Sequence, residues 1–275
     1  MRTDAVSPRD HSPAPPAAAV GRSTTYPRSL EGKVALVVGG AGAIGAETSR
    51  MLKAAGAKVV ISHLAAEKDT AAAAALIAEL GEGHAAFVAD VADTPSLVAL
   101  RDAIAARYGR LDILVNAAGF TKPVPHADLD ALTDELIDRM LQVNWRGQFA
   151  TIRTFAPLLK ASGDGLVVNI SSIAAFTAVG SSIAYCAAKA GIDVMTKALG
   201  RALAPEVRVL AVSPGVVDTE FVPGRGADFN DKVSASTPLK RIGNAQDIAA
   251  AITACATMLG FSTGHTIQVD GGRAL

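Results

Sequence analysis

From Lys33 onward, short apolar segments alternate with longer segments of helical period, and this alternation constrains the fold more than any other feature. Apolar runs bounded by glycine or polar residues are typical of strands buried on both faces of a sheet. Such runs occupy 34–39, 58–62, 84–90, 111–119, 166–171, 207–213 and 265–270. Because helical segments separate them, the strands are expected to pair in parallel through right-handed crossovers. The sequence predicts an α/β fold: one doubly wound parallel sheet of about seven strands with helices on both faces.

The segments between the strands carry the periodicity and punctuation of helices. We expect helices over 43–56, 65–80, 95–108, 129–160, 184–204 and 246–259. Thr94 and Pro95 suit the cap and first position of the third helix. The helix over 129–160 contains Pro157, which predicts an interruption there. In the helix over 184–204, an apolar stripe is expected to face the sheet: Ile192, Met195, Leu199 and Leu203.

The first 28 residues differ from the rest in composition. They hold five of the 13 prolines and show neither helical nor strand periodicity. Such a segment buries too little apolar surface to fold by itself. We therefore expect a disordered N-terminal extension over 1–28 and a single catalytic domain over 29–275, which fits a chain of 275 residues.

Charge and cysteine content exclude several classes of protein. Lys+Arg and Asp+Glu both total 26, so no net positive field favours binding of nucleic acid or anionic lipid. The two cysteines, Cys186 and Cys255, offer neither a disulfide framework nor metal-ligand spacing. No apolar run approaches the roughly 18 residues of a membrane span. We expect a cytoplasmic protein without a metal site that binds neither nucleic acid nor membranes.

The first strand ends in a glycine-rich turn, Gly39-Gly40-Ala41-Gly42-Ala43-Ile44-Gly45, directly before a helix. Glycines there allow a tight turn and let a pyrophosphate approach the N–H groups at the helix N-terminus. A glycine cluster alone also serves strand–helix packing. Its position between the first strand and first helix favours a dinucleotide site.

The end of the second strand bears on the choice between NAD and NADP. An acidic residue there accepts the ribose 2′-OH of NAD, whereas a basic residue suits the 2′-phosphate of NADP. This chain has Ser62-His63-Leu64, and Lys68 follows about one helical turn later. The missing acid favours NADP over NAD, although His63 is equally compatible with a plain surface position.

The stretch Ser171–Lys189 contains a candidate catalytic group. Tyr185 and Lys189 are four positions apart near a helix start, so their side chains share one face. An ammonium beside a phenol lowers the phenol pKa and lets it exchange a proton near neutral pH. Ser172 lies 13 positions before Tyr185 and brings a hydroxyl if a strand end places it there. The plain alternatives are a surface helical pair with an exposed lysine and a serine that caps a strand end.

These motifs together resemble the short-chain dehydrogenases/reductases, in the branch that includes 3-oxoacyl-carrier-protein reductases. The resemblance runs from about Leu30 to Gly272. It is carried in order by Val38-Gly39 to Gly45, Asp90-Val91, Asn116-Ala117-Ala118-Gly119, Asn144, Ser172, Tyr185-x-x-x-Lys189, Ser213-Pro214-Gly215 with Thr219, Thr263-Gly264 and Val269 to Gly272. Val38 replaces the family's threonine, Ala43 its middle glycine and Ala117 its second asparagine. Val38 and Ala117 together remove a hydroxyl and an amide that fix the glycine loop in the family, and loss of both partners at once can be nearly neutral.

The resemblance implies a Rossmann-like fold and a ketone–alcohol oxidoreductase that uses NADP or NAD. Tyr185 would be the general acid/base, Ser172 a hydrogen-bond donor to the carbonyl oxygen and Lys189 the group that lowers the tyrosine pKa. Asn144 would anchor a water that links Lys189 to solvent, or would simply lie at a helix kink. It also implies a homotetramer, or a homodimer. The implied cofactor-binding residues are Gly39, Gly42, Ala43, Ile44, Gly45, His63, Asp90, Val91, Asn116, Ala117, Gly119, Tyr185, Lys189, Pro214, Gly215, Val217 and Thr219.

The substrate is only broadly indicated. The segment 218–240 lacks clear periodicity and is expected to cover the pocket as a mobile lid. Apolar candidates for the pocket wall are Phe120, Ala174, Phe176, Val216 and Phe221, which favour a ketone or secondary alcohol with an apolar body. Arg225 suits an anionic group or a solvated lid position. The alternatives are an NAD-dependent dehydrogenase of a cyclic or sugar alcohol and a cofactor-binding sensor without catalysis.

Overall fold

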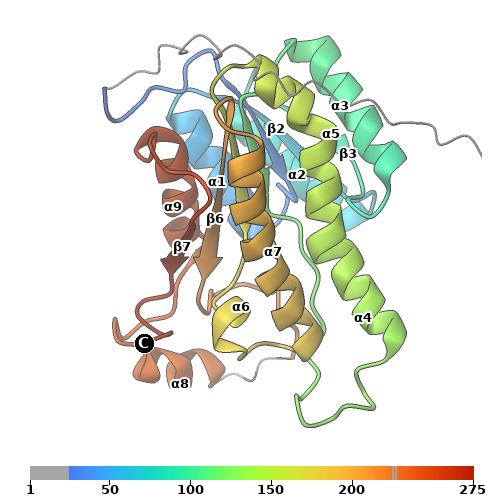
Figure 1. Ribbon diagram of the computed structural model, residues 1–275, viewed down its shortest axis with the longest axis vertical. Helices are drawn as coiled ribbons and strands as arrows, with labels where there is room; N and C mark the ends of the chain where they lie inside the picture. The colour runs from blue at the N-terminus through green and yellow to red at the C-terminus, as the bar shows by residue number, and fades with distance from the viewer. Residues whose placement is uncertain (1–24, 225, 227) are drawn as a thin grey trace, which may run out of the picture.

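The computed structural model describes residues 25–224, 226 and 228–275 of the chain (Figure 1). Seven parallel strands form one sheet in the order β3-β2-β1-β4-β5-β6-β7. This confirms the predicted doubly wound sheet. The strands are β1 (Val34–Val38), β2 (Lys58–His63), β3 (Ala85–Val88), β4 (Ile113–Asn116), β5 (Gly165–Ile170), β6 (Val207–Pro214) and β7 (Thr266–Val269).

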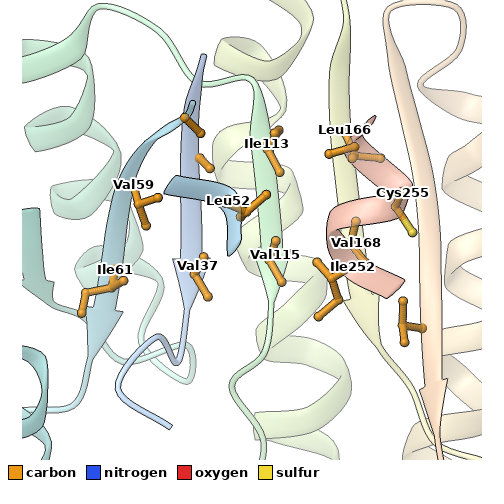
Figure 2. Packing of buried hydrophobic residues seen from close by; sticks show 14 of the residues in the cluster. Val37, Leu52, Val59, Ile61, Ile113, Val115, Leu166, Val168, Ile252 and Cys255 are labelled. Carbon is orange, nitrogen blue, oxygen red and sulfur yellow. The ribbon is translucent and has the colours of Figure 1, made fainter. Parts of the chain in front are cut away.

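Helices cover both faces of the sheet. Successive side chains of a strand point to opposite faces, and in the central strands both sets are apolar, so both faces need to be buried. One face packs against α1 (Ala43–Ala54), α2 (Glu67–Leu80) and α9 (Ala245–Thr257). Figure 2 shows this cluster, in which Leu52 of α1 lies against Val37 and Val115, and Ile252 of α9 lies near Val168. The other face packs against α3 (Thr94–Tyr108), α5 (Gly147–Ala161) and α7 (Ile183–Ala202).

The apolar stripe expected on α7 is confirmed. Ile192 and Met195 are buried in the second cluster, and Leu199 and Leu203 pack against it. α7 therefore lies along the sheet with its N-terminus at the carboxyl edge of the strands, as the downward arrows of β6 and β7 show in Figure 1. This orientation brings the start of α7 to the edge where α/β sheets bind ligands.

The long helical region differs from the prediction. It consists of α4 (Asp134–Leu141), a π-helical turn η1 (Gln142–Arg146) and α5. The expected interruption near Pro157 is wrong, because α5 continues through Pro157 to Ala161. The irregular turn lies earlier and contains Asn144, for which a helix kink was one of the two expected positions.

Three smaller features also differ. The cap of α3 is Asp93, whose carboxylate accepts the N–H of Ser96, rather than Thr94. Two short helices, α6 (Ala174–Thr177) and α8 (Phe229–Ser236), are present where no helix was expected. Both lie at the carboxyl edge of the sheet (Figure 1). The segment predicted as an irregular lid thus contains one ordered helix, α8.

The N-terminal extension lies mostly outside the described residues, which begin at Thr25. Arg28 donates its backbone N–H to Thr257 O at 2.9 Å, and its guanidinium pairs with Asp164 at 3.2 Å. Within the described residues, no helix is long and apolar enough to cross a membrane.

Candidate active site

Tyr185 is held at the first turn of α7. Ser182 is the N-cap residue, and its hydroxyl accepts the backbone N–H of Tyr185 at 3.2 Å. A serine cap fixes where the helix begins, so it also fixes the height of the tyrosine above the sheet edge. The phenol is half-buried and packs with Phe120 against a small cluster that contains Met140 and Ala188.

Lys189 lies one turn further along α7 and is only 3% exposed. Its Nζ donates to Ile170 O, the last residue of β5, at 2.7 Å, and lies 5.6 Å from the centroid of the Tyr185 ring. Burial lowers the pKa of Lys189 to about 8, and the carboxylate of Asp193 opposes this shift. The predicted pairing of the two side chains on one helix face is confirmed as geometry.

Two adjacent serines after β5 have different surroundings. Ser171 is 1% exposed, and its hydroxyl donates to Lys189 O at 3.3 Å. Ser172 is half-buried, and its Oγ accepts the N–H of Ala174 at 3.2 Å where α6 begins. The fold thus places Ser171 inside against α7, whereas the half-exposed hydroxyl at the sheet edge belongs to Ser172.

Asn144 is fully buried in the π-helical turn. Its Nδ2 donates to Phe120 O at 2.7 Å and to Met140 O at 3.0 Å, while its Oδ1 accepts the N–H of Phe120 at 3.0 Å. The amide therefore bonds to the backbone of Phe120 on both sides, as a neighbouring strand would. Asn144 fixes the loop that follows β4, and Phe120 in this loop packs against the same buried cluster as Tyr185.

The glycine-rich turn has the shape of an anion cradle. Gly39 has φ +77°, which favours glycine, and a Cβ on Gly45 would lie 2.3 Å from Gly39 O. Gly42 is the N-cap of α1 without a side-chain cap, and both Gly42 and Ala43 are exposed. The N–H groups at the start of α1 thus face an open surface, with no side chain of the turn in the way. These residues fit the pyrophosphate of a dinucleotide.

The losses at Val38 and Ala117 are compensated by the backbone. Val38 is 1% exposed and packs in the core, and Ala117 donates its N–H to Val38 O at 2.9 Å. A Cβ on Gly39 would also meet Ala118 N at 2.7 Å, so the two loops lie in close contact. The glycine turn and the Asn116–Gly119 segment remain joined without the two polar side chains.

Several of the predicted cofactor-binding residues have their side chains engaged elsewhere. Asn116 is 1% exposed and donates from Nδ2 to Asn169 Oδ1 at 2.9 Å on the neighbouring strand β5. Asp90 accepts the N–H of Ala92 at 2.8 Å, and Val91 is buried beside Gly147. The side chains of Asn116 and Val91 are therefore directed into the core, and a contact with a cofactor falls to the backbone of these segments.

The segment after β6 is tied to its neighbours by backbone bonds. Gly215 donates to Val269 O at 3.0 Å, and Val217 forms a bridge with Gly243. Pro214 accepts the N–H of Ile173 at 3.0 Å, which links this segment to the serine loop. Thr219 is half-buried at the carboxyl edge. The candidate nicotinamide segment is thus held next to Ser172, as predicted.

Phe221 closes the space above Tyr185. Their ring centroids are 6.3 Å apart at an interplanar angle of 53°, and a Cβ on Gly119 would meet the Phe221 ring at 3.5 Å. Phe221 is 41% exposed, so an apolar ring remains at the surface beside Tyr185, and Phe176 in α6 is 48% exposed. Arg225 lies outside the described residues.

At the end of β2, His63 is 8% exposed, so the alternative of a plain surface position is wrong; its Nδ1 lies 2.8 Å from Leu64 O. The side chain of Lys68 pairs with Glu220 at 3.1 Å. The sequence interpretation missed this pair, because the two residues are 152 positions apart and no local pattern joins them. Within 25–224, 226 and 228–275 there is no group of three or more His, Cys, Asp or Glu that could hold a metal ion.

Comparisons with known proteins cover nearly the whole chain. A family model described as enoyl-(acyl carrier protein) reductase matches residues 39–274. Cis-4-hydroxycyclohexanecarboxylate dehydrogenase of Sinomonas cyclohexanicum is 36% identical over 87% of this chain and 96% of its own length. D-threitol dehydrogenase of Mycolicibacterium smegmatis is 36% identical over 91% of this chain and 96% of its own. The crystal structure of 3-ketoacyl-(acyl-carrier-protein) reductase from Brucella melitensis complexed with NADH is similar with a TM-score of 0.80, 32% identity, and coverage of 90% and 100%.

Proposed function

Because the chain belongs to the short-chain dehydrogenase/reductase family, we propose how its own residues carry out the reaction, which cofactor it prefers and which substrates it takes. The protein is an NAD(P)-dependent oxidoreductase that interconverts ketones and secondary alcohols. The bound nicotinamide supplies the hydride in reduction and accepts it in oxidation.

Tyr185 is the general acid/base in this proposal. Negative charge develops on the carbonyl oxygen as the ketone is reduced, so a proton donor beside that oxygen lowers the barrier. The buried ammonium of Lys189, 5.6 Å from the Tyr185 ring centroid, is the single observation that carries the assignment. A positive charge in a low-dielectric site favours the phenolate and makes the phenol a better acid.

Ser172 and Asn144 support this chemistry in different ways. Ser172, half-buried at the end of β5, donates its hydroxyl to the same carbonyl oxygen. Asn144 acts as a positioning residue, because its amide holds the backbone of Phe120, whose ring packs against the same cluster as Tyr185. Gly39, Gly42, Ala43, Ile44 and Gly45 hold the pyrophosphate. The remaining contacts to the dinucleotide come from His63, Asp90, Val91, Asn116, Ala117, Gly119, Pro214, Gly215, Val217 and Thr219, together with Tyr185 and Lys189.

NADP is proposed as the preferred cofactor, with NAD as the alternative. The end of β2 carries Ser62, His63 and Leu64 and therefore lacks the carboxylate that favours NAD. Titration of the purified protein with NADPH and with NADH, followed by nicotinamide fluorescence, tests this preference. The proposal fails if NADH binds more tightly than NADPH.

The substrate is proposed to be a ketone or secondary alcohol with an apolar body. The exposed ring of Phe221 beside Tyr185 supports it, as does the exposed ring of Phe176 in α6. A cyclic or sugar alcohol is the second candidate, favoured by the two similar dehydrogenases of a hydroxycyclohexane ring and of threitol. A panel of aliphatic, cyclic and polyol substrates, assayed at the nicotinamide absorbance, separates them. Highest kcat/KM for the polyols would contradict the first candidate.

We also propose that the protein assembles as a homotetramer or homodimer in the cytoplasm. Trp145 is 39% and Val194 67% exposed on the outer side of η1 and α7, where Trp145 donates to Gly191 O. An apolar face of this kind supports burial against a second copy. The two buried thiols, Cys186 and Cys255, are compatible with a reducing compartment. Light scattering of parent and Val194→Glu tests the assembly, and an unchanged mass would contradict the proposed face.

A further inference from the structure

Lys68 and Glu220 join two segments that are distant in the chain. Lys68 lies in the first turn of α2, directly after β2, and Glu220 lies in the segment that follows β6. Lys68 Nζ is 3.1 Å from Glu220 Oε2, and both side chains are largely solvent-exposed. The pair is therefore accessible to a ligand that arrives at the sheet edge.

The sheet order shows what the pair spans. β2 and β6 are separated by four strand steps, through β1, β4 and β5. At a strand spacing of ~4.8 Å, this corresponds to about 19 Å along the edge. The intervening crevice, between the oppositely directed connections of β1 and β4, is where a doubly wound sheet binds its dinucleotide. The segment after β6 thus carries Glu220 across this crevice to the helix that follows β2.

The charge of Glu220 matters because β2 itself ends without a carboxylate. Lys68 is the basic side chain in the first turn after β2, where the ribose 2′ position is recognised. Its ammonium favours a 2′-phosphate, but the carboxylate of Glu220 already holds it. A phosphate and a carboxylate compete for the same cation and repel one another.

We propose that Glu220 is a specificity-determining residue: it neutralises Lys68 and lowers the preference for a 2′-phosphorylated cofactor. The segment after β6 thereby supplies, from 152 positions away, the acidic group that the end of β2 lacks. This inference rests on the proposed function, since it requires the dinucleotide to lie in the crevice. It predicts that the preference for NADPH over NADH in the parent is small, and that removal of the carboxylate increases it.

The experiment compares the parent with Glu220→Gln, Lys68→Gln and the double variant. Glu79→Gln is the matched control, because it makes the same substitution and breaks another exposed ion pair, with Arg50, at the far end of α2. The dissociation constants for NADPH and NADH are measured by fluorescence in low salt. The ratio of kcat/KM with the two cofactors and one ketone is a second readout.

Glu220→Gln is expected to tighten NADPH by about 1.5- to 5-fold, the range for an exposed ion pair, and to leave NADH unchanged. Lys68→Gln is expected to weaken NADPH alone, and the gain from Glu220→Gln is expected to shrink in the double variant. Glu79→Gln is expected to leave both constants unchanged.

An unchanged NADPH-to-NADH ratio in Glu220→Gln would overturn the inference. Equal weakening of the binding of both cofactors would also overturn it. That result indicates an ion pair that stabilises the segment after β6 and does not select between NADPH and NADH. A parent that binds neither cofactor would contradict the proposed function itself. Binding of both cofactors with an unchanged ratio would remove only the role of Glu220.

Discussion

Lys189 illustrates how one residue can be costly for folding and useful for chemistry. Burial lowers its pKa to about 8, because the charged ammonium is less stable in the protein interior than in water. The carboxylate of Asp193 acts against this shift. The positive charge near Tyr185 stabilises the phenolate, which is the form of the tyrosine left after it gives its proton to the product alcohol.

Ketone reduction is predicted to lose efficiency as pH rises above about 8. The reaction needs a proton on Tyr185 and positive charge on Lys189, whose pKa is lowered to about 8 by burial. The kcat/KM profile reports such groups in the free enzyme, and the apparent pKa belongs to the coupled pair. A profile of ketone reduction from pH 6 to 10 measures it. A kcat/KM that stays constant up to pH 10 would contradict the role of Lys189.

The same residue is predicted to give a pH-dependent stability. Between about 8 and the ordinary value of 10.5, the unfolded chain holds a proton on Lys189 that the folded chain has lost. Stability therefore rises with pH across this interval, by up to about 3 kcal/mol for this group. Urea unfolding of the parent and Lys189→Met at several pH values isolates the contribution. A stability difference between the two proteins that is independent of pH would argue against the lowered pKa.

Among the elements, the π-helical turn η1 connects the helix layer to the site. Asn144 lies within this turn, and its amide bonds to both the N–H and the C=O of Phe120 in the loop after β4. π-turns are often found at functional sites. Here the turn contains the residue that holds Phe120, and Phe120 packs against the same buried cluster as Tyr185.

Asn144→Ala is predicted to destabilise the protein by about 1–3 kcal/mol, because it leaves the N–H and C=O of Phe120 without their partner in a buried site. Its kcat is expected to fall more than its KM for the cofactor rises. Gln142→Ala, in the same turn but partly exposed, is the control and is expected to change stability by less than about 0.5 kcal/mol. Equal effects of the two substitutions in urea unfolding would contradict the account.

The elements differ in how far the sequence predicts them. β1, β4, β5 and β6 are buried along their whole length, so each appears in the sequence as an apolar run. The interruption of the long helix was predicted near Pro157 because proline is a visible local signal, whereas the bond from Asn144 to Phe120 crosses 24 positions. The Tyr185–Lys189 pair was predictable because it depends on helical spacing alone. The Lys68–Glu220 pair depends on the order of the strands, which local patterns do not specify.

At the scale of the whole molecule, the two edges of the sheet have different tasks. The carboxyl edge carries Tyr185, Ser172 and the glycine turn. The amino edge carries Asp112, which is 1% exposed and accepts from Lys33, Arg110 and the N–H of Val34. Burial alone would raise the pKa of Asp112, but these hydrogen bonds hold it below its ordinary value.

Asp112→Asn is therefore predicted to lower stability by about 2 kcal/mol at pH 7 while the kcat of the folded enzyme remains unchanged. Because its pKa is lowered, the carboxylate of Asp112 stabilises the fold at pH values above the ordinary pKa of Asp. This stabilisation is lost as pH falls through the pKa of the folded state. Thermal unfolding from pH 2 to 7 measures it, and a parent–variant difference that does not shrink as pH falls below the ordinary Asp value would contradict the linkage. A large loss of kcat would show that the two edges are not independent.

The central claim is that Tyr185 transfers the proton in a nicotinamide-dependent reduction. Tyr185→Phe removes only the hydroxyl and keeps the ring that packs against the Met140 cluster and Phe221. Its turnover with the best ketone, measured at saturating cofactor, is predicted to fall by about 10²- to 10⁴-fold. The dissociation constant for NADPH is predicted to stay within about twofold of the parent, because the substitution keeps the ring and changes the binding free energy by less than ~0.5 kcal/mol. Turnover of Tyr185→Phe close to that of the parent would contradict the assignment.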